Sequence, residues 1–196
     1  EEPVPDVHIA WLAATQLPNG AAGEGGVADV EATSLAALAH VGEGTSLDEG
    51  TWREPVRRYV GWLLAQQRAD GSFEARSEGS LQRYAQATYA LAEATRRSAS
   101  GALLRTAVAD ATRFLLSQKR REGGFGPSCG VPCTAVATAW AFVAITGAQR
   151  CSAIPGDARR SVQQHEVVAV HDLVGDRGRQ VAGALALDAT QRVGVA

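Results

Sequence analysis

Hydrophobic and polar residues recur in the same order in three segments of this chain, and each segment begins with an aromatic ring. The rings are Trp11, Trp62 and Phe114, and each is followed by a leucine, by a glutamine four or five positions on, and by a glycine nine positions on. The rings are separated by 51 and 52 residues. A constant period of this length indicates one supersecondary unit that is repeated along the chain.

A second pattern, rich in small residues, follows each ring segment. Alanine and threonine dominate residues 32–38, 87–92 and 137–142. Apolar positions recur at helical spacing, so each unit is predicted to be an antiparallel helical hairpin, and the fold class to be all-α. Each glycine is expected to cap the first helix of its hairpin in the left-handed conformation. The predicted helices cover residues 6–16, 29–41, 52–68, 81–97, 101–119 and 133–147.

The form ring-Leu-x-x-x-Gln-x-x-x-Gly-x-aromatic resembles the prenyltransferase/squalene-oxidase repeat family, which includes squalene–hopene cyclases and protein prenyltransferase β-subunits. The match is carried by Trp62 to Phe73 and by Phe114 to Phe125. The resemblance implies a partial α/α toroid whose open flank needs a cap or a partner, because three hairpins do not close a ring. It also implies a structural role, linking successive hairpins, for Gln16, Gln67, Gln118, Phe73 and Phe125.

The family's cyclases protonate an alkene with an Asp-x-Asp-Asp-Thr motif. This chain has Asp29-Val30-Glu31-Ala32-Thr33 at the matching place, which makes Asp29 and Glu31 the candidate catalytic acids. Alternatively, Asp29 caps a helix and Glu31 interacts with the dipole of its first turn. The Ala/Thr-rich helices would line a concave face, so the candidate binding residues are Thr33, Thr88, Thr138 and Tyr84.

The cysteines and histidines do not supply a complete metal site. Cys129 and Cys133 are four residues apart and could form a disulfide, contribute to a zinc site, or remain free thiols. Cys151 would lie too far along the last predicted helix to pair with either of them. His8 and His40 are isolated in the sequence and are expected at the surface or at helix ends. We therefore expect no metal and no cofactor.

Composition restricts the classes of partner. The net charge is −2, which argues against nucleic-acid binding, and no apolar run is long enough to span a membrane. The first 50 residues contain nine acidic and no basic side chains, whereas the remainder has a net charge of +7. The acidic part either binds a basic partner or a cation, or is simply solvated.

The two ends of the sequence carry further expectations. The chain opens with Glu1-Glu2-Pro3 rather than methionine, which suggests a removed signal peptide and an extracytoplasmic location, although a fragment boundary would look the same. A repeat domain is predicted over residues 1–150 and a separate extension over 151–196. Valine-rich runs around Gly175-Asp176-Arg177-Gly178 suggest a β-hairpin in that extension, and its alanine and leucine content also allows a helix.

The leading hypothesis from these patterns is a non-catalytic, exported helical-repeat module that binds or scaffolds as a subunit of a larger protein complex. The first alternative is an enzyme of the terpene-cyclase or prenyltransferase type that uses Asp29 and Glu31. The second is a protein that binds an isoprenoid or another lipid on its concave face without chemistry.

Overall fold

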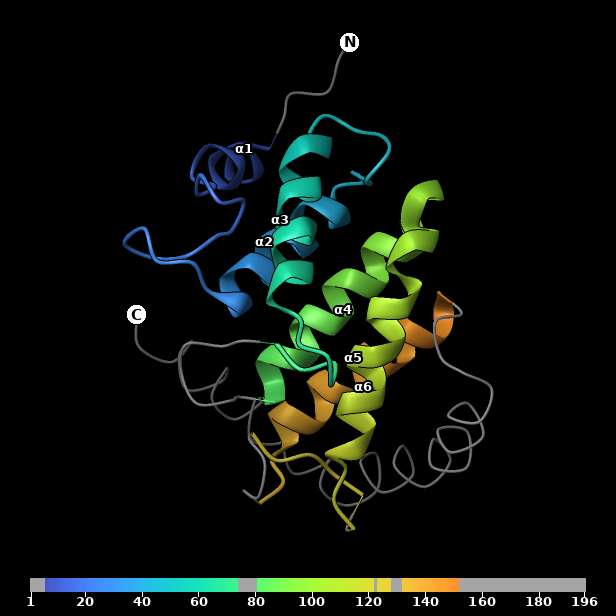
Figure 1. Cartoon of the computed structure of the whole chain (residues 1–196). Coiled ribbons are helices and arrows are strands. Elements are labelled where there is room, and N and C mark those ends of the chain that lie inside the picture. Colours follow the sequence, from blue (N-terminus) through green and yellow to red (C-terminus); the bar gives the residue numbers. More distant parts are fainter. Residues whose placement is uncertain (1–5, 74–80, 122, 128–131, 152–196) are drawn as a thin grey trace, which may run out of the picture. The chain divides into compact units, whose positions relative to one another are not determined.

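The computed structural model of this chain describes residues 6–73, 81–121, 123–127 and 132–151. Two compact units make up the chain, residues 1–155 and 156–196, and every element described below belongs to the first. The hairpin predicted around residues 175–178 lies outside the described residues. The elements are α1 (Val7–Ala14), α2 (Val30–Gly42), α3 (Arg53–Gln66), α4 (Leu81–Arg97), the 3₁₀ helix η1 (Ala99–Leu104), α5 (Arg105–Ser117) and α6 (Ala135–Arg150) (Figure 1).

These elements confirm the all-α prediction. The described ranges contain six α-helices and no strand, and each helix lies within a few residues of its predicted place. The largest difference is at the start of α5, where η1 takes up residues that had been assigned to the helix. A short 3₁₀ turn is a common connector at a helix terminus.

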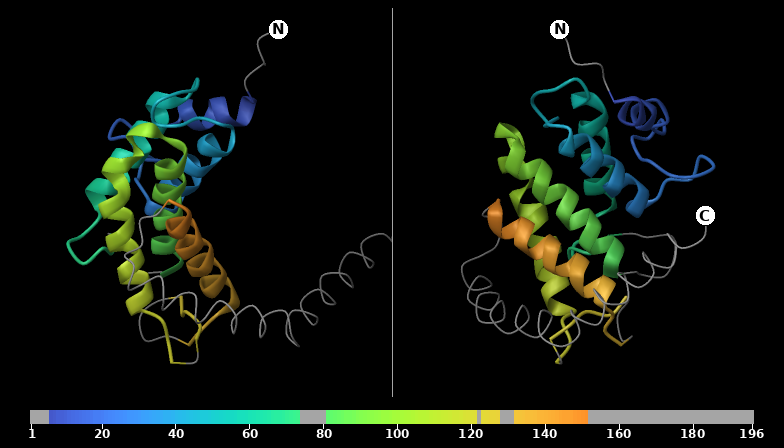
Figure 2. Two further views of the ribbon diagram at one scale, coloured as in Figure 1. Left: turned by 90° about the vertical axis from the view of Figure 1, so that its right-hand side faces the viewer. Right: turned by 180° about the vertical axis from the view of Figure 1, so that it is seen from behind.

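The second helices of the three hairpins pack side by side in the order α2, α4, α6. Helix α4 lies between α2 and α6, while α3 packs against α2 and α4, and α5 packs against α4 and α6 (Figure 2). Small residues allow the close approach that the sequence predicts: a methyl group on Gly147 of α6 would lie 2.8 Å from the ring of Tyr89 on α4. The alanine-rich helices α2, α4 and α6 therefore form one layer of adjacent helices.

The same turn follows the first helix of every hairpin. In the second turn, the Arg68 amide donates to the Ser72 carbonyl and the Gly71 amide donates to the Arg68 carbonyl. Equivalent pairs of bonds occur one period earlier at Leu17 and Gly20, and one period later at Arg120 and Gly123. The sequence repeat thus encodes a repeated backbone conformation.

The turn glycines are left-handed, as expected, but they do not cap the helices. Gly20, Gly71 and Gly123 have φ values of 90°, 89° and 93°. Helices α3 and α5 end earlier, with Gln67 and Gln118 at their C-caps. The predicted capping role was wrong, because each glycine completes a separate hydrogen-bonded turn beyond the helix.

Two of the repeat glutamines connect successive hairpins. The Gln16 side-chain amide donates to the Pro55 carbonyl in the first turn of α3, at 3.0 Å. The Gln67 amide donates to the Ala107 carbonyl in the first turn of α5, at 2.9 Å. Both also donate back into their own turns. Each glutamine therefore fixes one turn against the first turn of the next hairpin, as the resemblance implied.

His40 lies in the last turn of α2, so the predicted helix-end position is correct, but the residue is not at the surface. Its side chain is fully buried, and its ring lies 5.6 Å from Tyr59 and 6.0 Å from Trp52, centroid to centroid. The Nδ1 atom pairs with the Ala36 carbonyl at 2.8 Å, while Nε2 is buried without a partner. The packing of α3 on the end of α2 encloses this ring. His8, in contrast, is exposed as predicted.

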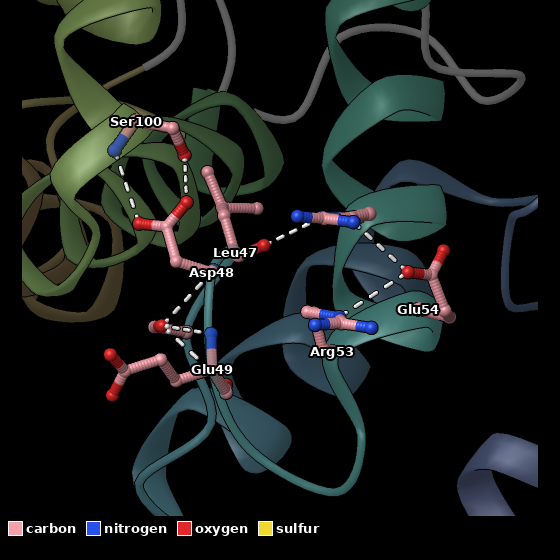
Figure 3. A network of polar contacts seen from close by, with 8 residues as sticks. Leu47, Asp48, Glu49, Arg53, Glu54 and Ser100 are labelled. Atoms are coloured by element: carbon pink, nitrogen blue, oxygen red, sulfur yellow. Dashed lines mark hydrogen bonds and ion pairs between the residues drawn. The ribbon is translucent and has the colours of Figure 1, made fainter.

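A polar network joins two connections that are distant in sequence. Asp48 lies between α2 and α3, and its carboxylate accepts from the hydroxyl of Ser100 at 2.5 Å and from the Ser100 amide at 3.1 Å (Figure 3). The Leu47 amide donates to the Ser98 hydroxyl, and the Leu47 carbonyl accepts from Arg57. Corresponding connections of successive repeats are thus held together.

This network predicts loss of stability in acid. The hydrogen bonds from Ser100 lower the pKa of the Asp48 carboxyl below its ordinary value of 3.8. Unfolding restores the ordinary pKa, so the contribution is complete above that value and is lost as the pH falls through the native one. We expect the urea midpoints of wild type and Asp48→Asn to converge between about pH 6 and about pH 2.5.

Equal separation of those two midpoints at every pH would contradict the prediction. Some acid sensitivity should persist in Asp48→Asn, because the hydroxyl and amide of Ser72 also lower the pKa of Asp70.

Candidate functional site

The candidate acids lie in a polar cluster at the start of α2. The Asp29 carboxylate accepts from the Ala32 amide at 2.9 Å, so Asp29 is the N-cap of this helix. Arg83 of α4 lies 3.6 Å from the Asp29 carboxylate and 3.3 Å from the Glu31 carboxylate. Gln86, one turn along α4, donates to Glu31 at 3.2 Å. The four side chains therefore connect the starts of two neighbouring helices.

This arrangement holds Glu31 as an acceptor. One carboxylate oxygen of Glu31 forms an ion pair with Arg83 and the other accepts a hydrogen bond from Gln86, and the Glu31 side chain is 32% exposed. A general acid must carry a proton and direct it at the substrate, and protonating an alkene also needs a dry cavity. The geometry fits a structural ion pair better than it fits a proton donor.

Gln86 is a residue of this cluster that sequence reasoning missed. It is 2% exposed, its amide nitrogen is used by Glu31, and its Oε1 has no hydrogen-bond partner. Arg83 was equally unassigned as a site residue. The only signal was their place in a predicted helix of the repeat, because charge pairing between helices cannot be read from a single sequence.

The threonines nominated for binding are bonded to backbone; Thr33 is buried and Thr138 is partly buried. Thr33 accepts from the Ala22 amide and donates to the carbonyls of Ala22 and Asp29. Thr138 makes the matching pair of bonds with the backbone of Phe125. Each hydroxyl therefore holds the residue two positions after the turn glycine, Ala22 or Phe125, against the helix that follows the turn.

The other two nominated residues also lie in the helical packing. Thr88 is fully buried and donates to the Tyr84 carbonyl one turn earlier. The ring of Tyr84 packs edge-on against Phe114 at 5.6 Å and tilts against Phe73 at 6.3 Å. Tyr84 therefore contributes to the junction between the second and third repeats, whereas the bond of Thr88 lies within α4.

The described residues provide no metal centre. No group of three histidine, cysteine or acidic side chains within them could hold an ion. Cys133 is partly buried beside Gly124, and Cys151 is buried at the end of α6, with its thiol 3.2 Å from the Ala148 carbonyl. Cys129 lies outside the described residues, so its pairing with Cys133 stays a prediction. Within the same residues, no helix is long and apolar enough to cross a membrane.

A different surface emerges when the repeats are superimposed by sequence. Thr88 of α4 aligns with Thr138 of α6, a shift of 50 residues that places Ala92 on Phe142 and Glu93 on Val143. Ala92 is fully buried, and the Ala92 methyl lies 3.5 Å from a methyl placed on Gly147 of α6. Phe142 and Val143 are each 38% exposed. The position that α6 covers at Ala92 of α4 is thus open at Phe142 on α6 itself.

Among the described residues, the third turn likewise lacks the neighbouring helix that packs on the first two turns. A methyl group on Gly20 would lie 2.9 Å from the Arg58 carbonyl of α3, and one on Gly71 would overlap the Asp110 carbonyl of α5. A methyl group on Gly123 meets no described atom within 4 Å. We call Gly123, Phe142 and Val143 the trailing edge. These residues of the third repeat correspond to the surface on which each of the first two repeats contacts the repeat that follows it.

No known protein family matches this chain, and no curated protein is significantly similar to it. The resemblance to the prenyltransferase/squalene-oxidase repeat therefore depends on the residues quoted above, and the geometry of the edges is the basis for a functional argument.

Proposed function

We propose that this chain is a non-catalytic helical-repeat module, a partial α/α toroid, whose trailing edge binds a helical segment of another polypeptide. The observation that carries the proposal is the exposure of Phe142 and Val143 at positions whose equivalents on α4 are buried. Contiguous apolar surface on a folded protein commonly marks an interaction site. In a repeat array, each unit buries its apolar face only against its neighbour.

The polar cluster supports a non-catalytic role. Arg83 and Gln86 engage both oxygens of Glu31, and Asp29 is occupied as a helix cap. The candidate binding threonines Thr33 and Thr138 are bonded to backbone. The cyclase alternative requires that Glu31→Gln abolish turnover of a polyprenyl substrate, whereas we expect no turnover by the wild type.

A helix copied from the chain itself provides the test. A fluorescent, hydrocarbon-stapled peptide of residues 81–97 reproduces α4, which packs on α2 in the first repeat. Stapling offsets the cost of nucleating an isolated helix. We expect saturable binding to the intact chain by fluorescence anisotropy. Phe142→Glu should weaken it about tenfold or more, because buried aromatic contacts dominate interfaces.

The matched control is Leu103→Glu, which places the same charge at a side chain that is 86% exposed on η1. Circular dichroism would establish that both variants are folded. Peptide binding that is absent, or that is equally strong in Phe142→Glu and wild type, would refute a docking role for the trailing edge.

A further inference from the structure

We infer that the segment docking on the trailing edge belongs to a second copy of this chain, which associates head to tail through its first repeat. This inference rests on the proposed function and names its partner. We call the matching surface the leading edge, consisting of Val7 and Trp11 on α1 and Leu35 on α2. These three side chains are 70%, 64% and 42% exposed.

The leading edge follows from the way α3 meets the first turn. Arg58 donates to the carbonyls of Leu17 and Pro18, and Tyr59 donates to the Leu12 carbonyl. When Trp62 is aligned with Trp11, a shift of 51 residues, Arg58 of the second repeat aligns with Val7 of the first. Val7 and Trp11 are four residues apart and share one face of α1. The exposed face of α1 is therefore the face that α3 turns toward the preceding repeat.

Helix α2 shows the same correspondence. Thr33 aligns with Thr138, a shift of 105 residues that places Gly42 on Gly147. Gly147 is where α6 packs on Tyr89 of α4, whereas a methyl group on Gly42 would meet nothing within 4 Å. Leu35 lies seven residues before Gly42 and so occupies the same stripe of its helix. Both helices of the first repeat present the surface that later repeats use to contact their predecessors.

The charges of the two edges are complementary. Residues 1–50 carry nine acidic and no basic side chains; Asp29 and Glu31 pair with Arg83 and Asp48 with Ser100, whereas Asp6 directly precedes Val7 at the leading edge. The third turn, which contains Gly123, begins with Lys119, Arg120 and Arg121. Opposite charges at the two edges favour head-to-tail contact and disfavour contact between two identical edges. A heterologous contact of this kind produces rings or open chains of copies.

Sedimentation velocity over a concentration series tests the inference on the intact chain. We expect wild type to self-associate, and to do so less as salt is raised from about 50 mM to about 500 mM. Trp11→Glu blocks the leading edge and Phe142→Glu the trailing edge. Each variant alone should be monomeric, with its dissociation constant raised about tenfold or more. Leu103→Glu should associate like wild type.

Mixing the two blocked variants supplies the decisive result. Trp11→Glu keeps its trailing edge and Phe142→Glu keeps its leading edge, so an equimolar mixture should form a one-to-one dimer. A mixture that stays monomeric, or a Trp11→Glu variant that associates like wild type, overturns the inference. A monomeric wild type that still binds the stapled helix through Phe142 would also overturn it and leave the proposed function intact. Failure of that peptide to bind would remove both.

Discussion

Replacing Gly71 by alanine should destabilise the protein by about 3 kcal/mol. The residue has φ of 89°, which costs an L-amino acid about 1–2 kcal/mol. Its new methyl group would also overlap the Asp110 carbonyl of α5, where overpacking adds about 1–3 kcal/mol. Urea unfolding followed by circular dichroism measures the change.

Gly123→Ala is the matched control for that prediction. Gly123 has nearly the same φ, 93°, in the same kind of turn, but no described atom lies within 4 Å of the added methyl group. Only the backbone cost of about 1–2 kcal/mol should remain. If both variants lose equal stability, the contact between the second turn and α5 is not what constrains Gly71.

Phe73→Ala should cost about 3–5 kcal/mol, which is the usual range for a large aromatic side chain removed from a core. Phe73 is fully buried two residues after Gly71, and its ring lies 6.3 Å from that of Tyr84. Truncation leaves a cavity where the second turn meets α4. The free energy of unfolding from urea titration provides the value.

Leu103→Ala should change stability by less than about 0.5 kcal/mol, because this side chain is 86% exposed. Phe73→Leu should retain much of the lost stability, since it fills most of the same volume. A Phe73→Ala variant as stable as Leu103→Ala would mean that the second turn contributes little to the core.

The repeat predicted far more of this protein than did its individual polar residues. The helices followed from a pattern found in successive segments, and the linking roles of Gln16 and Gln67 from the family resemblance that this pattern carries. The position of His40 at a helix end was predicted, but its burial was not, because a single histidine carries no periodic signal and only the packing of Trp52 and Tyr59 shows that it is buried.

The candidate site was also predictable from the sequence only in part. Asp29 was open to two interpretations, a catalytic acid or a helix cap, and the structure shows the cap. The partners of Glu31 could not be read from the sequence, because Arg83 and Gln86 are more than 50 residues away along the chain. The contact of Glu31 with these two side chains depends on how closely α2 and α4 pack. The alanine content indicates that the two helix axes lie close together, but it does not determine which polar groups meet.

The sequence by itself determined the helical hairpins, their period and the left-handed glycine that follows each first helix, because these depend on local spacing and on glycine's access to positive φ. The tertiary structure alone decided which apolar side chains remain uncovered. Ala92 and Phe142 occupy equivalent positions in the pattern, yet one is buried and the other is 38% exposed. Burial depends on whether a neighbouring helix is present, and that is a property of the packed array rather than of any one repeat.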